Sequence, residues 1–264
     1  MRADFRSRSA ALAPCLAVLC VALATAACGG GTSSEPAPAA PATPTTNPVD
    51  PATAGSVTGR IAFAGTLPTP DPINMESDPY CADRNRNART ERVMVDGNGG
   101  LRNVFVHVKD GLGTLRFPVP ATAVVLDQRN CAYTPRVFGI QVGQPLEILN
   151  SDSTLHNIHA MPEANREFNR GQSMQGQKDT HIFSAAEAMV PFKCDVHRWM
   201  NAWVGIVEHP FYAVTGTDGV FELKGLPPGT YTIEAWHETL GTQTTSVTIG
   251  AKETGTVSLT FKAS

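Results

Sequence analysis

The chain has 264 residues, enough for one large domain or two modest ones. Its net charge is −3, only 17% of its residues are charged, and it has no basic tail or stripe, which argues against a nucleic-acid partner. The sequence contains 23 glycines and 20 prolines, so many turns and an all-β fold are expected.

Residues 1–28 have the pattern of an export signal. Three arginines precede an apolar stretch, which ends in small residues before Cys28. This pattern is typical of a secretory signal peptide. The ending "TAAC" resembles that of bacterial lipoprotein signals, which implies that Cys28 carries lipid. We therefore expect an exported protein, periplasmic or at the cell surface and lipid-anchored to a bacterial membrane. An ordinary cleaved signal and an uncleaved anchor helix are the alternatives.

Residues 29–55 are rich in proline, alanine and threonine and contain no aromatic residue. Such a segment cannot bury enough apolar surface to become ordered. The composition predicts a disordered, extended tether between the anchor and the folded part.

The region 56–207 is predicted to form a β-sandwich or barrel. Short apolar or alternating runs are separated by glycine, proline, asparagine and aspartate, as is typical of these folds. Strands are expected at 56–65, 101–111, 122–128, 135–152, 180–185, 189–194 and 201–215. The polar stretch 163–179 is expected to be a short helix or a long loop.

The region 208–264 has the pattern of a smaller antiparallel β-sandwich. Four alternating strands are separated by strong turn signals at Asp218-Gly219 and Pro228-Gly229. The "DGVFEL" and "LPPGTY" stretches resemble those of carboxypeptidase regulatory-like, or transthyretin-like, modules. The resemblance implies a fold and little chemistry, since such modules are mostly structural or binding units.

Three cysteines lie outside the N-terminal signal, at Cys81, Cys131 and Cys194. An exported protein folds in an oxidising compartment, so two of the three should pair. Cys81 and Cys131 lie in polar loops without neighbouring metal donors, whereas Cys194 has a histidine and a methionine beside it. We predict a Cys81–Cys131 disulfide and a functional thiolate at Cys194; a buried structural free cysteine is the alternative.

The stretch "FKCDVHRWMNAW" places Cys194, His197 and Met200 three residues apart. A blue-copper electron-transfer site uses two imidazoles, one thiolate and a weak axial thioether. The second imidazole is expected upstream, where His156 and His159 follow a predicted strand. We favour His156, because Asn157 beside it can brace the cysteine loop by a hydrogen bond.

The "HNIHA" and "CDVHRWM" stretches resemble those of the cupredoxins, and of amicyanin in particular. The resemblance covers about residues 95–207. It implies a Greek-key sandwich that binds one type 1 copper through His156, Cys194, His197 and Met200, with Asn157 as the bracing residue. Zinc is the alternative metal, but methionine is a poor zinc ligand.

These features predict a one-electron carrier and not an enzyme. The redox partner cannot be read from the sequence. A non-catalytic module that binds carbohydrate or an envelope protein through its C-terminal domain, and a copper delivery or sensing protein, are the alternatives. Trp199 and Trp203 are expected to exclude water or to contact the second domain. His237 is expected to be structural or to lie at the domain contact.

Overall fold

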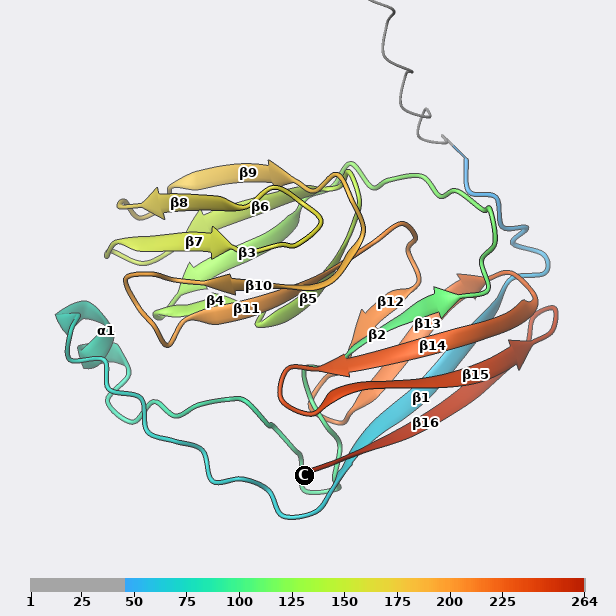
Figure 1. The fold of residues 1–264 in the computed structure, drawn as a ribbon, viewed down its shortest axis with the longest axis horizontal. Helices are drawn as coiled ribbons and strands as arrows, with labels where there is room; N and C mark the ends of the chain where they lie inside the picture. The colour runs from blue at the N-terminus through green and yellow to red at the C-terminus, as the bar shows by residue number, and fades with distance from the viewer. Residues whose placement is uncertain (1–45, 264) are drawn as a thin grey trace, which may run out of the picture. The chain divides into compact units, whose positions relative to one another are not determined.

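The computed structural model describes residues 46–263 as an all-β protein with one short helix (Figure 1). The all-β class predicted from the sequence is confirmed. The predicted signal peptide, the lipidation site at Cys28 and most of the predicted tether lie outside the described residues.

Two sheets form what we call the first sandwich. One sheet has the strand order β4 (Ala132–Thr134), β3 (Val124–Arg129), β6 (Pro145–Asn150), β9 (Lys178–Ile182). The other has the order β5 (Val137–Gln141), β11 (Asn201–Val207), β10 (Glu187–Lys193), β7 (His156–Ala160), β8 (Phe168–Gln172). Inward residues of both sheets, such as Leu126 and Ile148 against Val190 and Val204, share one apolar core.

Two further sheets form the second sandwich. One has the order β13 (Val220–Leu226), β1 (Gly55–Ala64), β16 (Thr254–Lys262). The other has the order β12 (Tyr212–Val214), β2 (Phe105–Asp110), β14 (Gly229–His237), β15 (Gly241–Ile249). Val57 and Phe221 from the first of these sheets and Val106 and Ile233 from the second lie in a shared core.

The second sandwich contains strands from both sides of the domain boundary that the sequence predicted between residues 207 and 208. Strand β1 lies between β13 and β16, and β2 lies between β12 and β14, so both belong to the second sandwich. The sequence grouped these strands with the region 56–207. A local pattern predicts that a segment is a strand, but it does not specify the partner with which that strand pairs.

The predicted tether also ends earlier than expected. Val49 is buried in the second core. The backbone N–H of Lys252 donates to the carbonyl of Thr53 at 3.0 Å, and β1 then begins at Gly55. The segment from Val49 to Gly55 is therefore part of the fold and not of a disordered linker. The burial of a single valine in a proline-rich stretch gives little signal in the composition of residues 29–55.

The polar stretch 163–179 contains a strand and not a helix. Strand β8 pairs antiparallel with β7, in the register His156 to Gln172 through Ala160 to Phe168. Its middle three residues are exposed, as expected for the edge strand of a sheet. An edge strand buries few side chains, so its sequence can be polar throughout. The polar composition therefore suggested a short helix or a long loop instead of a strand.

A long connection between β1 and β2 leaves the second sandwich, reaches the first and returns (Figure 1). It leaves β1 at Ala64, forms the six-residue helix α1 (Pro79–Arg84), and returns to bridge Ala62 at Gly100. Cys81 of α1 forms a disulfide with Cys131, which lies between β3 and β4. These are the two cysteines that the sequence predicted to pair, and the bond ties α1 to the first sandwich.

A small apolar cluster lies where the two sandwiches meet, and two glycines make room for it. Gly139 of β5 and Gly205 of β11 are register partners. A Cβ atom added to Gly205 would lie 2.3 Å from the ring of Phe105, and one added to Gly139 would lie 2.3 Å from the ring of Tyr212. Rings of the second sandwich thus pack directly on the backbone of the first.

Polar contacts complete this interface. Arg136 donates two hydrogen bonds to the carboxylate of Glu238, at 2.9 and 2.8 Å, and the indole of Trp203 donates to the same carboxylate at 3.1 Å. Trp203 also packs on Trp236, with ring centroids 5.1 Å apart. Trp203 is therefore a contact for the second sandwich, one of the two roles expected for it.

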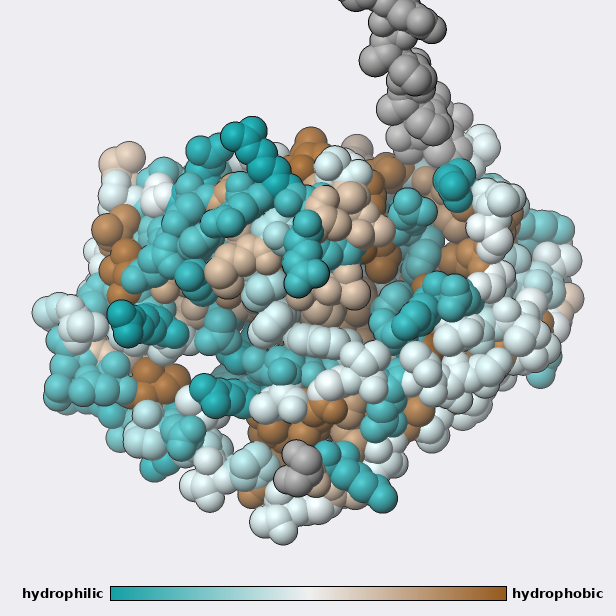
Figure 2. Space-filling view, in the orientation of Figure 1, coloured by the Kyte–Doolittle hydropathy of each residue, from teal (hydrophilic) through white to brown (hydrophobic). Residues whose placement is uncertain are grey.

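Hydrophobic residues on the face shown in Figure 2 lie in small groups separated by hydrophilic ones. The large apolar side chains that are exposed come from scattered parts of the chain: Leu67, Val125, Leu155, Met174, Ile182, Val196 and Val220. Among residues 46–263 there is no helix of the length and apolarity needed to cross a lipid bilayer.

Candidate metal centre

Two histidines and a cysteine converge inside the first sandwich. His156 begins β7, and Cys194 follows β10, which pairs antiparallel with β7. The Nδ1 atoms of His156 and His197 are 2.9 Å apart, and Cys194 Sγ lies 3.9 Å from His197 Nδ1. One donor atom from each residue lies within 4.8 Å of the other two. None of the three residues is more than 2% exposed.

The loop from Cys194 to Met200 is held closed by its own backbone. The N–H of Cys194 donates to the carbonyl of Met200 at 3.1 Å, and the N–H of Met200 donates to that of His197 at 2.9 Å. The N–H of His197 also donates to Cys194 Sγ at 3.3 Å. The side chain of Met200 is 1% exposed and lies in the same apolar core as Cys194. The loop therefore holds Cys194 and His197 close together and buries Met200 in the core beside them.

Asn157 connects the loop to β7. Its side-chain oxygen accepts hydrogen bonds from the N–H of Asp195 at 2.7 Å and from the thiol of Cys194 at 3.2 Å. Its side-chain N–H groups donate to Asn169 and Asp195, and its carbonyl accepts a hydrogen bond from the hydroxyl of Tyr133. Asn157 thus occupies the position that the sequence proposed for a bracing residue.

Each histidine is held from behind by a carboxylate. Asp152 Oδ2 lies 2.9 Å from His156 Nε2, and Asp78 Oδ2 lies 2.9 Å from His197 Nε2. A carboxylate at Nε2 keeps the proton on that nitrogen and leaves the Nδ1 lone pair free for a metal. Both rings therefore present Nδ1 toward Cys194.

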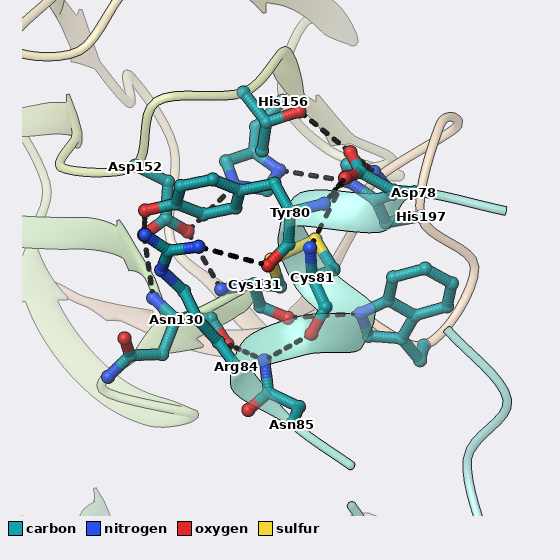
Figure 3. Close-up of a disulfide and its surroundings, with 12 residues drawn as sticks. Asp78, Tyr80, Cys81, Arg84, Asn85, Asn130, Cys131, Asp152, His156 and His197 are labelled. Carbon is teal, nitrogen blue, oxygen red and sulfur yellow. Dashed lines mark hydrogen bonds and ion pairs between the residues drawn. A yellow bond between two sulfur atoms is a disulfide. The ribbon is translucent and has the colours of Figure 1, made fainter. Parts of the chain in front are cut away.

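The two carboxylates are themselves fixed by the disulfide region (Figure 3). Asp152 accepts hydrogen bonds from the N–H groups of Cys131 at 2.7 Å and Asn130 at 2.9 Å. Asp78 is the N-cap of α1 and accepts from the N–H groups of Tyr80 and Cys81. The disulfide joins the helix that carries Asp78 to the turn whose backbone N–H groups hold Asp152, so it links the supports of both histidines.

The protonation states of Cys194 and of the two supporting aspartates suit metal binding. Burial acts to raise the pKa of the Cys194 thiol, but hydrogen bonds with His156 and His197 outweigh it and lower this pKa to about 6. Burial also opposes ionisation of Asp78 and Asp152, yet their hydrogen bonds hold the pKa of each carboxyl below its usual value. A thiolate ligand and ionised supporting carboxylates are thus present at neutral pH.

The donor spacing is somewhat shorter than a single small metal ion requires. A trigonal ion with metal–nitrogen bonds of about 2.0–2.1 Å needs nitrogens roughly 3.5 Å apart. The two Nδ1 atoms are 2.9 Å apart, within hydrogen-bond distance, and the sulfur lies 3.9 Å from one of them. A displacement of the rings by about half an ångström would open the space. Two imidazoles and a thiolate are the equatorial set of an electron-transfer copper site.

His159, the other upstream histidine, lies outside this cluster. Its ring contacts Asp195 at 3.0 Å and Glu167 at 2.7 Å. It stands three residues after His156 on β7, and the alternation of the strand turns it to the opposite face.

The supporting aspartates were not anticipated from the sequence. Asp152 lies four residues before His156 in a turn, which is a weak signal. Asp78 lies 119 residues before His197 and gives no local signal. Trp199 packs on His197 with ring centroids 4.9 Å apart, and its indole donates to the carbonyl of Cys131 at 3.1 Å. Trp199 therefore covers one side of the candidate site, which agrees with the expectation that it excludes water.

Comparison with known families characterises the C-terminal part of the chain. Residues 201–262 match the carboxypeptidase regulatory-like domain. The resemblance predicted there from the sequence is confirmed. The matched segment begins at β11, so it includes a strand of the first sandwich and lacks β1 and β2 of the second. No curated protein sequence gave a match to the chain.

Solved structures similar to this chain include copper proteins. A Cu-containing nitrite reductase from Thermus scotoductus SA-01 is 16% identical over 35% of this chain, with a TM-score of 0.32, and the match spans 24% of the reductase. A Cu(I) form of an amicyanin variant is 21% identical over 33% of this chain and 85% of its own, with a TM-score of 0.29. A purple cupredoxin from Nitrosopumilus maritimus is 22% identical over 32% of this chain and 98% of its own, with a TM-score of 0.28. The argument for copper rests on the donor set.

Proposed function

We propose that the protein binds one type 1 copper and carries single electrons outside the cytoplasm. His156, Cys194 and His197 would hold the ion, and Met200 would be the weak axial ligand. The observation that carries this proposal is the buried convergence of two Nδ1 atoms and one sulfur. Copper bound there would supply a couple between Cu(I) and Cu(II).

Rigidity of the donor set supports a carrier. The loop of Cys194 is closed by backbone hydrogen bonds, Asn157 fixes it to β7, and a carboxylate orients each histidine. Ligands held in place change little between two oxidation states, which keeps the reorganisation energy low. The burial of all three donors opposes copper delivery, because delivery requires that ligands of a partner protein reach the ion.

The cellular location is part of the same proposal. A structural disulfide suits an oxidising compartment. Together with the signal-like residues 1–28, it supports an exported protein, attached to a bacterial membrane through lipid on Cys28. The second sandwich, which contains the carboxypeptidase regulatory-like segment, would then be a rigid support for the copper domain.

A copper titration of the metal-free protein, truncated to begin at Gly29, tests the proposal. One equivalent of Cu(II) is expected to produce an intense visible thiolate-to-copper absorption band and a reversible one-electron couple. Cys194→Ser should abolish the band while leaving the far-ultraviolet circular dichroism unchanged. A pale spectrum with no thiolate band, or tighter binding of zinc than of copper, would contradict the proposal. Failure to bind any metal would leave the envelope binding module as the better account.

A further inference from the structure

The histidine ligands do not reach the surface, so an electron must leave the proposed centre by another route. The side chain of His197 is 2% exposed and that of His156 is 0% exposed. Asp78 and helix α1 occupy the Nε2 side of His197, and Asp152 occupies that of His156. An external redox partner therefore cannot make direct contact with either ring.

Trp199 offers a route from the site to a surface groove. Its half-buried indole packs on His197, with ring centroids 4.9 Å apart. It also lines a groove of about 320 Å³, to which Met200 contributes as well. We call this the arginine groove, because Arg89, Arg92, Arg136 and Arg198 line it beside Trp199.

The charge of the arginine groove is positive, although the whole chain is negative. Glu91 is the one acidic residue among those that line it. Arg136 is neutralised by Glu238, but within residues 46–263 neither Arg89, Arg92 nor Arg198 forms an ion pair with a carboxylate. All three of these arginines are exposed. Three free arginines against one glutamate leave a local excess of positive charge in a chain whose net charge is −3.

We propose that the arginine groove is the docking surface for the acidic face of a redox partner protein, and that Trp199 connects this face to the copper ligands. The inference rests on the proposed electron-carrier function. Polar and charged residues make up about half of the groove's lining, and four of them are arginines. Charge complementarity at such a surface accelerates encounter and selects among partners. With copper bound, one electron would pass from Cu(I) to the partner's oxidised centre, and no bond would form or break.

A matched pair of protein probes tests the docking surface. Native cytochrome c is basic, and succinylation of its lysines makes it acidic while retaining the haem. Binding of each probe to the metal-free protein is measured by calorimetry, which does not depend on copper. The oxidation of the copper-loaded, reduced protein by each ferric probe is then followed by stopped-flow absorbance. One electron moves from Cu(I) to the ferric haem in each turnover.

The expected result is that the succinylated probe binds more tightly and reacts faster than the native one, with a difference that shrinks as salt is added. Arg198→Glu should slow the reaction with the succinylated probe by roughly tenfold. Arg170→Glu, an equal charge change on exposed strand β8, should leave the rate within about twofold. Trp199→Leu should slow the electron transfer to both probes even at saturating probe concentration, where the rate no longer depends on binding.

Two outcomes separate this inference from the proposed function. Salt-sensitive binding of the succinylated probe by a protein that gives no thiolate-to-copper band would support docking of an acidic protein face but reject the redox role of that docking, together with the electron carrier. A normal band with equal effects of Arg198→Glu and Arg170→Glu, or faster reaction with the native basic probe, would reject the docking surface and leave the carrier intact. Binding of the small anion hexacyanoferrate in the groove, without binding of the succinylated protein, would also reject the docking surface.

Discussion

Asp78 accepts a hydrogen bond from His197 at 2.9 Å, although 119 residues separate them in the chain. The same carboxylate caps helix α1 and accepts a hydrogen bond from the hydroxyl of Thr154 at 2.7 Å. One side chain thus links the start of the helix to a proposed copper ligand. The connection between β1 and β2 therefore supplies part of the candidate metal centre.

Replacing this carboxylate tests its contribution to metal binding. Asparagine retains the capping oxygen, so Asp78→Asn should leave α1 in place. The negative charge behind His197 would be lost, and copper affinity is expected to fall by about 10- to 100-fold. Competition titration with a chelator of known affinity measures the change. Asp83→Asn on the same helix removes an exposed carboxylate that pairs with Arg86, away from the histidines, and should leave affinity unchanged. Equal losses in the two variants would contradict a role for Asp78 at the site.

The sequence was informative about the site where spacing is local. Cys194, His197 and Met200 lie in one loop, and His156 is identified by its neighbour Asn157, so short patterns carry the proposed donor set. The carboxylates behind the rings were not predictable, because a hydrogen bond between residues 78 and 197 depends on how the whole chain folds.

For the fold too, local features could be predicted from the sequence and long-range contacts could not. Alternating patterns predicted most strands, because burial of one face imposes a period of two. They did not reveal that β1 belongs to the second sandwich, since any β-strand offers the same backbone hydrogen bonds to any partner. Nor did they identify β8, whose exposed edge position removes the apolar signal. Pairing across long sequence separations is decided by the complete core.

A fragment of residues 208–264 tests the importance of β1. This fragment lacks the central strand of the sheet β13–β1–β16, together with Val57 and Ile61, which are fully buried. We expect the fragment to be unfolded, with poorly dispersed amide resonances. Addition of a peptide spanning residues 46–65 should not restore the fold, since β2 is missing as well. A cooperatively folded fragment would show that the second sandwich is independent of its N-terminal strands.

The close approach of the sandwiches at Gly205 predicts a large effect from a small substitution. Alanine there would place a methyl group 2.3 Å from the Phe105 ring, so the ring or strand β11 must move. Such overpacking typically destabilises a protein by about 1–3 kcal/mol. Gly171→Ala on β8 adds the same methyl group in open space and should be close to neutral. Urea denaturation of both variants measures the difference, and equal stabilities would show that the interface adapts without cost.

His237 predicts how stability depends on pH. Burial lowers the pKa of this histidine to about 4, and its Nδ1 accepts hydrogen bonds from the N–H groups of Thr239 and Leu240. The unfolded chain, with an ordinary histidine pKa near 6.5, binds this proton more readily than the folded protein. Stability from the neutral ring is therefore fully present above about pH 6.5 and is lost as the pH falls toward 4.

His237→Gln should be less stable than the parent at pH 7, and the difference should shrink by about 1–3 kcal/mol between pH 6.5 and 4. Denaturation curves across this range test the expectation, and a difference that stays constant with pH would show that His237 does not remain neutral in the fold.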